Sequence, residues 1–363
     1  MKILYVIDHL AFGGGQMSLK TIVENMTDDV ECLVCSLRNK PNEVEIGVPV
    51  IRLDSGKYNP FAFIQIAKIS KKYNIDILHP QLDKSIMLCL IASFFCKSKV
   101  VIHERGGITL LKGFASFLYR VILMFLHNRA SAIIANSNTM ASELQNKAKI
   151  PRDEIKVIYN PVDFKIFNLD NVSRIRERES LNIKENDFVI GYVGRLHYNK
   201  GVDILIEAFE ILSKKSSKYL LVLSGDGPQR QYLEQICERT GLISRVKFLG
   251  MCNNIPEIMA TFDVSVVPSR KEPFGRVAVE FMRMKTPVVS SGVGGLSEII
   301  EDNITGIITK ENTPSYIAEA IEILVANSGI VAKIIDNAFK YSERFNVNEH
   351  VKKIKSVYLE VLN

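Results

Sequence analysis

The stretch Ser269-Arg-Lys-Glu272-Pro-Phe-Gly275-Arg-Val-Ala-Val-Glu280 holds two carboxylates with a short turn between them. The apolar run 262–268 before it is typical of a strand, and the residues after Gly275 are typical of a helix start. Glu272 is therefore predicted on a loop, and Glu280 roughly two helical turns further along. A helix start attracts anions through its free N–H groups, and carboxylates accept hydrogen bonds from hydroxyls. A nucleotide sugar carries both kinds of group, so the stretch predicts a nucleotide-sugar site.

Further strand ends in the same half of the chain carry glycine or a basic residue. One apolar run ends at Gly194 and Arg195, with Lys200 shortly after it, and the next run ends at Gly225. The run 246–250 indicates another strand. A single glycine-rich loop has little specificity, but several ordered motifs at strand ends are specific. Ligands of open α/β sheets bind beyond the carboxyl ends of the strands, where all these motifs are predicted to lie.

These motifs resemble those of the retaining glycosyltransferases of family 4, which have the GT-B fold. The resemblance is close over residues 180–310 and looser over the first 165. It implies two Rossmann-like α/β domains that face each other across a deep cleft. Residues 1–165 would form the acceptor-binding domain, with a C-terminal helix of about 346–363 packed back onto it. Residues 166–345 would form the domain that binds the nucleotide sugar.

Strand-like and helix-like stretches alternate along the chain, which independently predicts parallel sheets with crossover helices. The predicted strands of the first half are 3–7, 31–36, 75–79, 100–103 and 132–135, and the predicted helices are 18–25, 61–72, 84–95, 110–125 and 139–147. The pattern restarts at Phe188, after a linker that begins at Asn160. This alternation predicts two domains of similar design.

The resemblance implies a role for each matched residue. Arg195 and Lys200 would stabilise the leaving diphosphate, which gains negative charge as the glycosidic bond breaks. Glu272 would contact the donor sugar, and Glu280 would accept hydrogen bonds from the ribose hydroxyls. The predicted catalytic residues are His103, Arg195, Lys200 and Glu272. The predicted donor-binding residues are Gly14, Gly15, Gly194, Gly225, Leu249, Met251, Phe274, Gly275, Arg276 and Glu280.

Three of these positions have alternative interpretations. His103 ends a predicted strand and matches a family position near the reacting sugar, but a single histidine is often structural. Arg276 stands where family members often carry an aliphatic residue, and either contacts the donor or lies in solvent on the outer side of the turn. The loop that contains Gly14 and Gly15 either faces the donor phosphate or is a simple tight turn. Its spacing is not Gly-x-Gly-x-x-Gly, which disfavours a dehydrogenase.

The net charge of +6 is unevenly distributed, because residues 1–160 hold 20 Lys+Arg and 14 Asp+Glu while the remainder is neutral. A basic N-terminal half suits an anionic partner, for which a membrane surface or a lipid-linked acceptor is preferred over nucleic acid. The helix-like segment 110–125 fits either an interfacial helix or a buried crossover helix. Cys32 and Cys35 lie in a predicted strand without a second Cys-x-x-Cys pair, so a zinc site is not expected.

The sequence therefore predicts a metal-independent transferase that needs no cofactor and retains configuration at the anomeric carbon. A UDP-sugar is favoured over a GDP-sugar as donor, with a glycan or lipid-linked acceptor in cell-surface polysaccharide assembly. The expected location is the cytoplasm, with peripheral attachment at the inner face of the cell membrane. Two alternatives stay open: a sugar-nucleotide epimerase with the same fold, and a nucleotide-sugar-binding protein without turnover.

Overall fold

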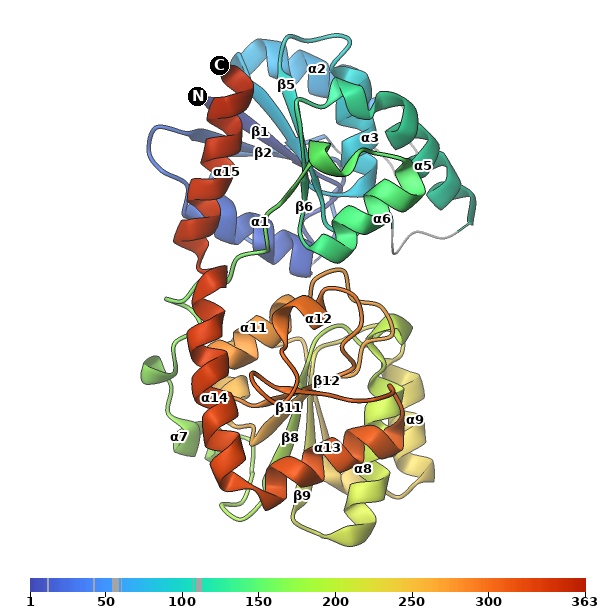
Figure 1. Cartoon of the computed structure of the whole chain (residues 1–363), viewed down its shortest axis with the longest axis vertical. Helices are drawn as coiled ribbons and strands as arrows, with labels where there is room; N and C mark the ends of the chain where they lie inside the picture. Colours follow the sequence, from blue (N-terminus) through green and yellow to red (C-terminus); the bar gives the residue numbers. More distant parts are fainter. Residues whose placement is uncertain (12, 42, 54–58, 60, 107, 109–112) are drawn as a thin grey trace. The chain divides into compact units, whose positions relative to one another are not determined.

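The computed structural model describes residues 1–11, 13–41, 43–53, 59, 61–106, 108 and 113–363. The chain divides into two compact units. Unit 1 consists of Met1–Val162 and Phe345–Asn363, and unit 2 consists of Asp163–Arg344. Each unit is a parallel sheet with helices on both faces (Figure 1). The borders fall close to the predicted ones, after residue 162 in place of 165 and after 344 in place of 345.

Unit 1 contains a seven-stranded sheet in the order β3-β2-β1-β4-β5-β6-β7, and every neighbouring pair is parallel. Its strands are β1 (Lys2–Ile7), β2 (Glu31–Ser36), β3 (Val50–Arg52), β4 (Ile77–Pro80), β5 (Lys99–Glu104), β6 (Ala132–Ala135) and β7 (Ile155–Val157). The order reverses direction beside β1, which is the arrangement of a Rossmann-like sheet. The loops that follow β1 and β4 therefore lie next to each other at the carboxyl end of the sheet.

Alternating side chains of β1 enter two different cores. Leu4 and Val6 belong to a core on one face of the sheet, while Tyr5 and Ile7 belong to a core on the other. Both faces are apolar because helices cover both, as expected for a parallel sheet. The helices are α1 (Gly14–Glu24), α2 (Ala62–Tyr73), α3 (Asp83–Ala92), α5 (Gly113–Leu126), α6 (Asn138–Ala148) and α15 (Val347–Leu362).

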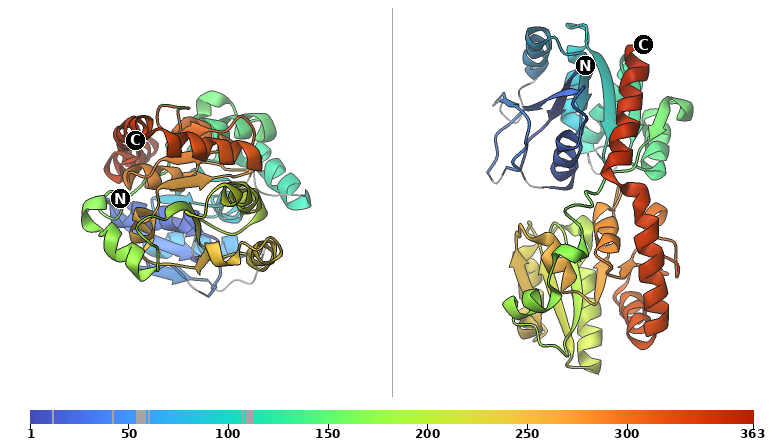
Figure 2. Two further views of the ribbon diagram at one scale, coloured as in Figure 1. Left: turned by 90° about the horizontal axis from the view of Figure 1, so that it is seen from below. Right: turned by 90° about the vertical axis from the view of Figure 1, so that its left-hand side faces the viewer.

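The C-terminal helix α15 lies beside α1 on one face of the unit 1 sheet, while α2, α3, α5 and α6 cover the other face (Figures 1 and 2). Ile354 and Tyr358 of α15 are fully buried there. The Tyr358 hydroxyl is 2.8 Å from the Tyr5 hydroxyl and also contacts Nδ1 of His79. The last residues of the chain therefore complete the core of the first unit.

Unit 2 contains a six-stranded parallel sheet in the order β10-β9-β8-β11-β12-β13. Its strands are β8 (Phe188–Val193), β9 (Tyr219–Ser224), β10 (Val246–Gly250), β11 (Val264–Val267), β12 (Val288–Ser290) and β13 (Ile307–Ile308). Its helices are α7 (Arg174–Ser180), α8 (Val202–Lys215), α9 (Arg230–Arg239), α10 (Ile255–Ala260), α11 (Arg276–Arg283), α12 (Leu296–Ile299), α13 (Pro314–Ala326) and α14 (Ser328–Ser342). Strands β8 and β11 are neighbours although α8, β9, α9, β10 and α10 separate them in sequence.

The expected α/β architecture is confirmed, with two Rossmann-like units. The predicted strands of the first half correspond to β1, β2, β4, β5 and β6, but β3 and β7 were not predicted. Each of these has three residues, too few to display a periodic pattern, and each is an edge strand. Part of the predicted helix 110–125 lies outside the described residues, and α5 is described from Gly113. No helix within the described ranges is long and apolar enough to cross a membrane.

Replacing Tyr358 with alanine is expected to destabilise unit 1 by about 3–5 kcal/mol, because it opens a cavity and removes the partner of Tyr5 and His79. The neighbouring exposed Leu359 provides a matched control. Leu359→Ala is expected to change stability by less than about 0.5 kcal/mol. Hydrogen exchange of α15 and urea unfolding followed by circular dichroism measure both. Equal effects of the two substitutions would show that α15 is not anchored through Tyr358.

Candidate active site

Glu272 is held at the carboxyl end of β11 by side chains from two loops. The Lys200 ammonium is 2.6 Å from Glu272 Oε2, and the Ser269 hydroxyl donates to the same oxygen at 3.2 Å. Only 8% of Glu272 is exposed, so the cation compensates for the loss of hydration of this carboxylate. The sequence placed Lys200 and Glu272 at different strand ends, and the structure brings them together because β8 and β11 are adjacent.

The loops that carry Lys200 and Glu272 approach each other through backbone contacts. A Cβ atom on Gly201 would lie 2.0 Å from the Pro268 carbonyl oxygen, and one on Gly294 would lie 2.1 Å from the Glu272 carbonyl oxygen. Both glycines also have a positive φ, 66° and 60°. The Gly295 N–H donates to the Glu272 carbonyl at 2.9 Å. The loop that carries Glu272 is therefore fixed on both sides by segments that only glycine can bring so close.

Arg270 fixes the same loop to the start of α8. Its guanidinium makes a two-pronged contact with Asp203, at 2.7 and 2.6 Å, and lies over the Tyr198 ring. Its backbone N–H donates to the Asn199 carbonyl at 2.7 Å. Sequence reasoning missed Arg270, Asp203 and Ser269 as parts of the site. Asp203 directly follows the Lys200-Gly201-Val202 motif, but its partner could not be identified from the sequence.

Glu280 lies on the first turns of α11 and is paired within the helix. Helix α11 begins at Arg276, directly after Gly275, whose φ of 102° starts the helix with a sharp turn. Arg276 Nε is 2.7 Å from Glu280 Oε1, as expected for side chains four residues apart. The two side chains are only 13% and 10% exposed. The interpretation of Arg276 as a solvated residue on the outer side of the turn is therefore wrong.

Three neighbouring strand ends are joined by backbone hydrogen bonds. The Gly194 N–H donates to the Ser224 carbonyl at 2.9 Å, and the Gly225 N–H donates to the Gly250 carbonyl at 2.8 Å. Arg195 follows the carboxyl end of β8 and is exposed to solvent. Its side chain makes no ion pair in the described part of unit 2. Arg195 therefore stands at the same carboxyl end of the sheet as Lys200, which is paired with Glu272.

The remaining predicted donor residues of unit 2 lie at the same carboxyl end of the sheet but differ in their exposure to solvent. The side chain of Phe274 is buried, so only its backbone is available to contact a ligand. The backbone N–H groups that follow it belong to the start of α11. Leu249 is half-buried and Met251 is exposed, just beyond β10. Burial, with a smaller contribution from the charge of Glu272, raises the pKa of Tyr192, whose hydroxyl donates to the Arg195 carbonyl. Tyr192 is therefore a neutral hydrogen-bond donor at this edge.

The predicted residues of unit 1 form a separate group. Helix α1 begins at Gly14, and Gly14 is exposed while Gly15 is half-buried. His103 is completely buried at the end of β5, between the rings of His79 at 5.6 Å and His350 at 6.2 Å. No atom of this side chain reaches solvent, so its contact with a donor sugar stays a prediction.

Arg105 organises the surroundings of His103. Its guanidinium lies 3.2 Å from His103 Nδ1 and donates to Gln81 at 2.9 Å and to Ser18 at 2.7 Å. Burial and the nearby Arg105 charge lower the pKa of His103 well below its ordinary value. The imidazole is therefore neutral near pH 7 and cannot act there as a cation. Sequence reasoning missed Arg105, although it stands two residues after His103.

Among the described residues, no group of three or more His, Cys, Asp or Glu is placed to hold a metal. Cys32 and Cys35 are buried on β2, and burial raises the pKa of each thiol to about 12. Both thiols are therefore protonated and packed in the interior.

The chain matches known proteins along both units. Residues 173–341 match the model of glycosyl transferases group 1, and residues 12–165 match the model of glycosyltransferase family 4. An uncharacterized glycosyltransferase of Methanocaldococcus jannaschii is 37% identical over 233 residues, which span 62% of this chain and 59% of the relative. The capsular polysaccharide biosynthesis glycosyltransferase CapM of Staphylococcus aureus is 25% identical over 339 residues, 89% of this chain and 86% of CapM.

Solved structures extend the likeness to the whole fold. HepE of Anabaena, crystallised in complex with UDP and glucose, is 27% identical to this chain. The superposition covers 99% of this chain and 100% of HepE, with a TM-score of 0.86. The two family models, the curated relatives and this structural match agree with the strand-end motifs described above. This chain therefore belongs to the family 4 glycosyltransferases of GT-B fold.

Proposed function

We propose that this protein transfers a sugar from a UDP-sugar to a hydroxyl of a glycan or lipid-linked acceptor, without a metal ion and with retention at the anomeric carbon. The observation that carries the proposal is the Lys200–Glu272 pair at the carboxyl end of the unit 2 sheet, beside the start of α11. The complex of HepE with UDP and glucose supports the choice of donor, and the name of CapM supports a role in polysaccharide assembly.

The cations at the carboxyl end of the unit 2 sheet would stabilise the negative charge of the leaving diphosphate. As the glycosidic bond breaks, negative charge grows on the diphosphate, so cations placed there stabilise the transition state more than the bound donor. Arg195 is exposed and lacks a competing anion in the described part of unit 2. The Lys200 ammonium has three N–H donors and can keep its contact with Glu272 while it donates to a phosphate oxygen. The proposed reaction therefore requires no divalent ion.

The carboxylates would recognise hydroxyls. Glu272 has one oxygen in the contact with Lys200 and Ser269, which leaves Oε1 to accept from the donor sugar. Glu280 keeps acceptor capacity beyond its contact with Arg276, and a carboxylate can accept about four hydrogen bonds. The proton of the acceptor hydroxyl would pass to the departing phosphate. In this scheme the new glycosidic bond forms on the face that the diphosphate leaves, which retains the configuration.

Product analysis tests the proposal directly. The protein is incubated with UDP-glucose or UDP-N-acetylglucosamine, an acceptor extract and EDTA, and the products are followed by mass spectrometry and proton NMR. Transfer with an α-linked product from an α-linked donor is expected. Inversion, strict dependence on added Mn²⁺ or Mg²⁺, or conversion of the donor into an epimer without transfer would each contradict the proposal.

Lys200→Ala and Glu280→Ala are each expected to lower turnover by roughly 10²- to 10³-fold, because each removes a contact to the charged or hydroxyl-bearing part of the donor. Lys214→Ala is the control, since Lys214 pairs with Glu210 on exposed α8 surface away from the strand ends. Steady-state kinetics with circular dichroism of each variant checks the result. Near-normal turnover of both site variants would refute the assignment.

Gly294→Ala is expected to lower turnover roughly 10²-fold. The new Cβ would clash with the Glu272 carbonyl and displace the Glu272 backbone, so the carboxylate would no longer be correctly oriented toward the donor sugar. Gly329→Ala is the matched control, because a Cβ there meets no atom within 4 Å. The same kinetic assay compares them. If Gly294→Ala retained full turnover, the position of Glu272 would not be critical for the reaction.

A further inference from the structure

Four charged side chains lie at the carboxyl end of the unit 1 sheet, and the proposed reaction leaves them without a role. Asp8 directly follows β1, Arg38 lies shortly after β2, and Asp83 and Lys84 begin α3, shortly after β4. We call these four residues the Asp8 cluster. Strand β1 pairs with both β2 and β4, and the strand order reverses between β1 and β4. Open α/β sheets bind ligands beyond the strand ends at such a switch point, so the Asp8 cluster lies where a ligand of unit 1 is expected.

Asp8 is buried, and one of its two carboxylate oxygens lacks a hydrogen-bond donor. Only 8% of the residue is exposed. Its Oδ1 accepts a hydrogen bond from the Ser85 N–H at 3.0 Å, whereas its Oδ2 accepts none from any described residue. Arg38 Nη2 lies 3.9 Å from Oδ2, which is too far for a hydrogen bond. Buried carboxylates normally have hydrogen-bond donors, so Oδ2 is available to accept from a ligand.

The neighbours of Asp8 surround it with both signs of charge. Burial, followed by the charge of Asp83, raises the pKa of Asp8 to about 7. The charges of Arg38 and Lys84 and the hydrogen bond from Ser85 act in the opposite direction. Burial also raises the pKa of Asp83. Asp8 therefore changes between a neutral carboxyl group and a carboxylate close to neutral pH, and a carboxylate perturbed in this way beside a switch point is typical of a functional site.

Arg38 supplies hydrogen-bond donors to the same place. Its side chain is 19% exposed, and its guanidinium donates to no described residue. A guanidinium carries five N–H donors in a fixed plane, so the Asp8 cluster presents an acceptor and a donor side by side. Each hydroxyl of a sugar can donate one hydrogen bond and accept others. Two neighbouring sugar hydroxyls therefore match the pair formed by Asp8 Oδ2 and the Arg38 guanidinium.

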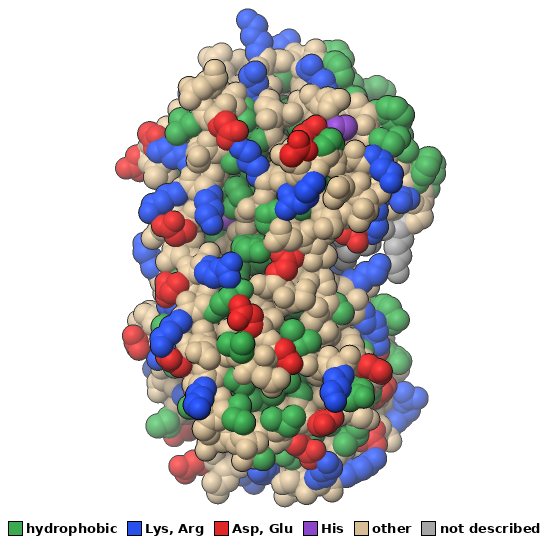
Figure 3. Space-filling model, in the orientation of Figure 1, with side chains coloured by type: hydrophobic (Ala, Val, Ile, Leu, Met, Phe, Trp, Pro, Cys, Tyr) green, Lys and Arg blue, Asp and Glu red, His purple; other side chains and the backbone are tan. Residues whose placement is uncertain are grey.

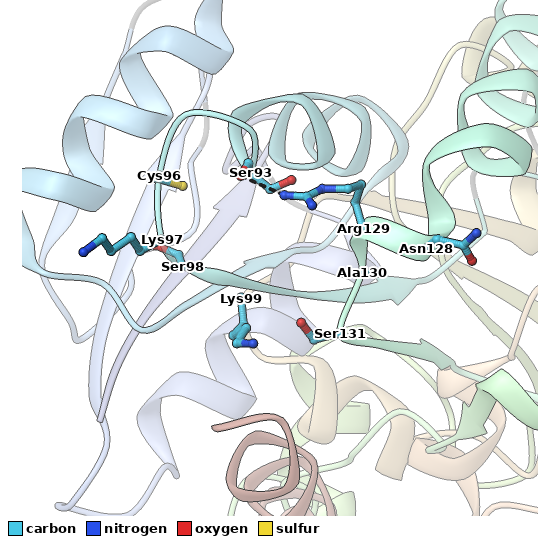
Figure 4. Close-up of a pocket in the computed structure, with 9 residues that line it drawn as sticks. All are labelled: Ser93, Cys96, Lys97, Ser98, Lys99, Asn128, Arg129, Ala130 and Ser131. Atoms are coloured by element: carbon cyan, nitrogen blue, oxygen red, sulfur yellow. Dashed lines mark hydrogen bonds between the residues drawn. The ribbon is translucent and has the colours of Figure 1, made fainter. Parts of the chain in front are cut away.

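The charge balance of the Asp8 cluster favours a neutral ligand. Two carboxyl groups accompany two cations, so a phosphate or carboxylate of a ligand would find no net positive charge there. A cavity of about 370 Å³ at the amino ends of β5 and β6 differs in this respect, because Lys97, Lys99 and Arg129 line it without any acid (Figure 4). Figure 3 shows lysine and arginine side chains scattered over the visible face of unit 1. The positive excess of this half is therefore not located in the Asp8 cluster.

We propose that the Asp8 cluster binds two neighbouring hydroxyl groups of a neutral sugar in the acceptor, with Asp8 Oδ2 accepting from one hydroxyl and the Arg38 guanidinium donating to the other. This inference rests on the proposed function, since it takes transfer to a glycan hydroxyl as given and adds the class of sugar that unit 1 holds. Asp8 binds the acceptor and takes no proton from it, because the proton of the reacting hydroxyl passes to the departing phosphate. The sugar held by unit 1 is then a neutral one, in place of a uronic acid or a sugar phosphate.

Binding of small glycosides to the full chain tests the proposal. The neutral probes are the methyl glycosides of glucose, galactose, mannose and N-acetylglucosamine, and the anionic probes are methyl glucuronide and glucose 6-phosphate. Dissociation constants are measured by saturation-transfer NMR with UDP present. At least one neutral glycoside is expected to bind more tightly than both anionic probes. Its affinity should fall about 10-fold from about pH 8 to about pH 6, because Asp8 takes up a proton near pH 7 and then accepts hydrogen bonds less strongly.

Substitutions in the Asp8 cluster separate binding from a purely structural role. Asp8→Asn is expected to weaken binding of that glycoside about 10-fold or more at alkaline pH and to abolish the pH dependence, because an amide does not ionise. Arg38→Gln should weaken binding as well and move the midpoint of the pH profile upward, since the Arg38 charge lowers the pKa of Asp8. Asp76→Asn is the matched control, because Asp76 accepts from the Lys2 N–H at 2.7 Å at the amino end of the same sheet. It should leave both the affinity and the pH profile unchanged.

These results together would support the proposal. Tighter binding of either anionic probe, binding of none of the probes, or a pH profile that persists in Asp8→Asn overturns it. UDP binding and circular dichroism, measured on every variant, identify a misfolded protein, and Arg38→Gln keeps the test decisive if Asp8→Asn does not fold. Failure of the wild-type protein to bind UDP would instead refute the proposed function, so the two failures are distinguishable.

Discussion

A carboxylate that is buried away from water is stabilised by a nearby cation. In this protein the cation is Lys200, whose ammonium lies 2.6 Å from Glu272 Oε2. The two residues come from loops after β11 and β8, which are far apart in sequence and adjacent in the sheet. The contact therefore fixes the position of the carboxylate and also keeps a cation at the edge where a diphosphate would lie. Removing either partner would leave the other charge partly buried and uncompensated.

The geometry around this pair is set by the backbone more than by side chains. Gly201 and Gly294 allow two other segments to approach the loop between β11 and α11 at distances that a Cβ would prevent. The bidentate contact of Arg270 with Asp203 ties the same loop to α8. A site built in this way is ordered before any ligand arrives, so little conformational entropy remains to be lost when the donor binds. This order suits a reaction that depends on accurate placement of charge.

Much of the fold could be predicted from the sequence, because strands such as β1, β8 and β10 are long enough to show an apolar pattern between turn residues. The short edge strands β3, β7 and β13 carry no such signal. At the site, the sequence located the strand ends but not the contacts between them, since Lys200 and Glu272 meet only through the strand order. The pairing of Arg276 with Glu280 was accessible from their spacing of four residues on one helix. The burial of His103 was not, because His350 reaches it from the C-terminal helix.

We propose that unit 2 binds a nucleoside diphosphate at the carboxyl end of its sheet, beside Lys200, Glu272 and Glu280. The most direct measurement is the thermal shift of the wild-type protein and of Glu280→Ala with UDP, GDP, ADP and NAD, all in EDTA. A ligand at one hundred times its Kd stabilises the folded state by about 2.7 kcal/mol. The wild-type protein is expected to show a thermal shift with UDP, and Glu280→Ala is expected to lose that shift. A shift with NAD alone, or an equal UDP shift in both proteins, would contradict it.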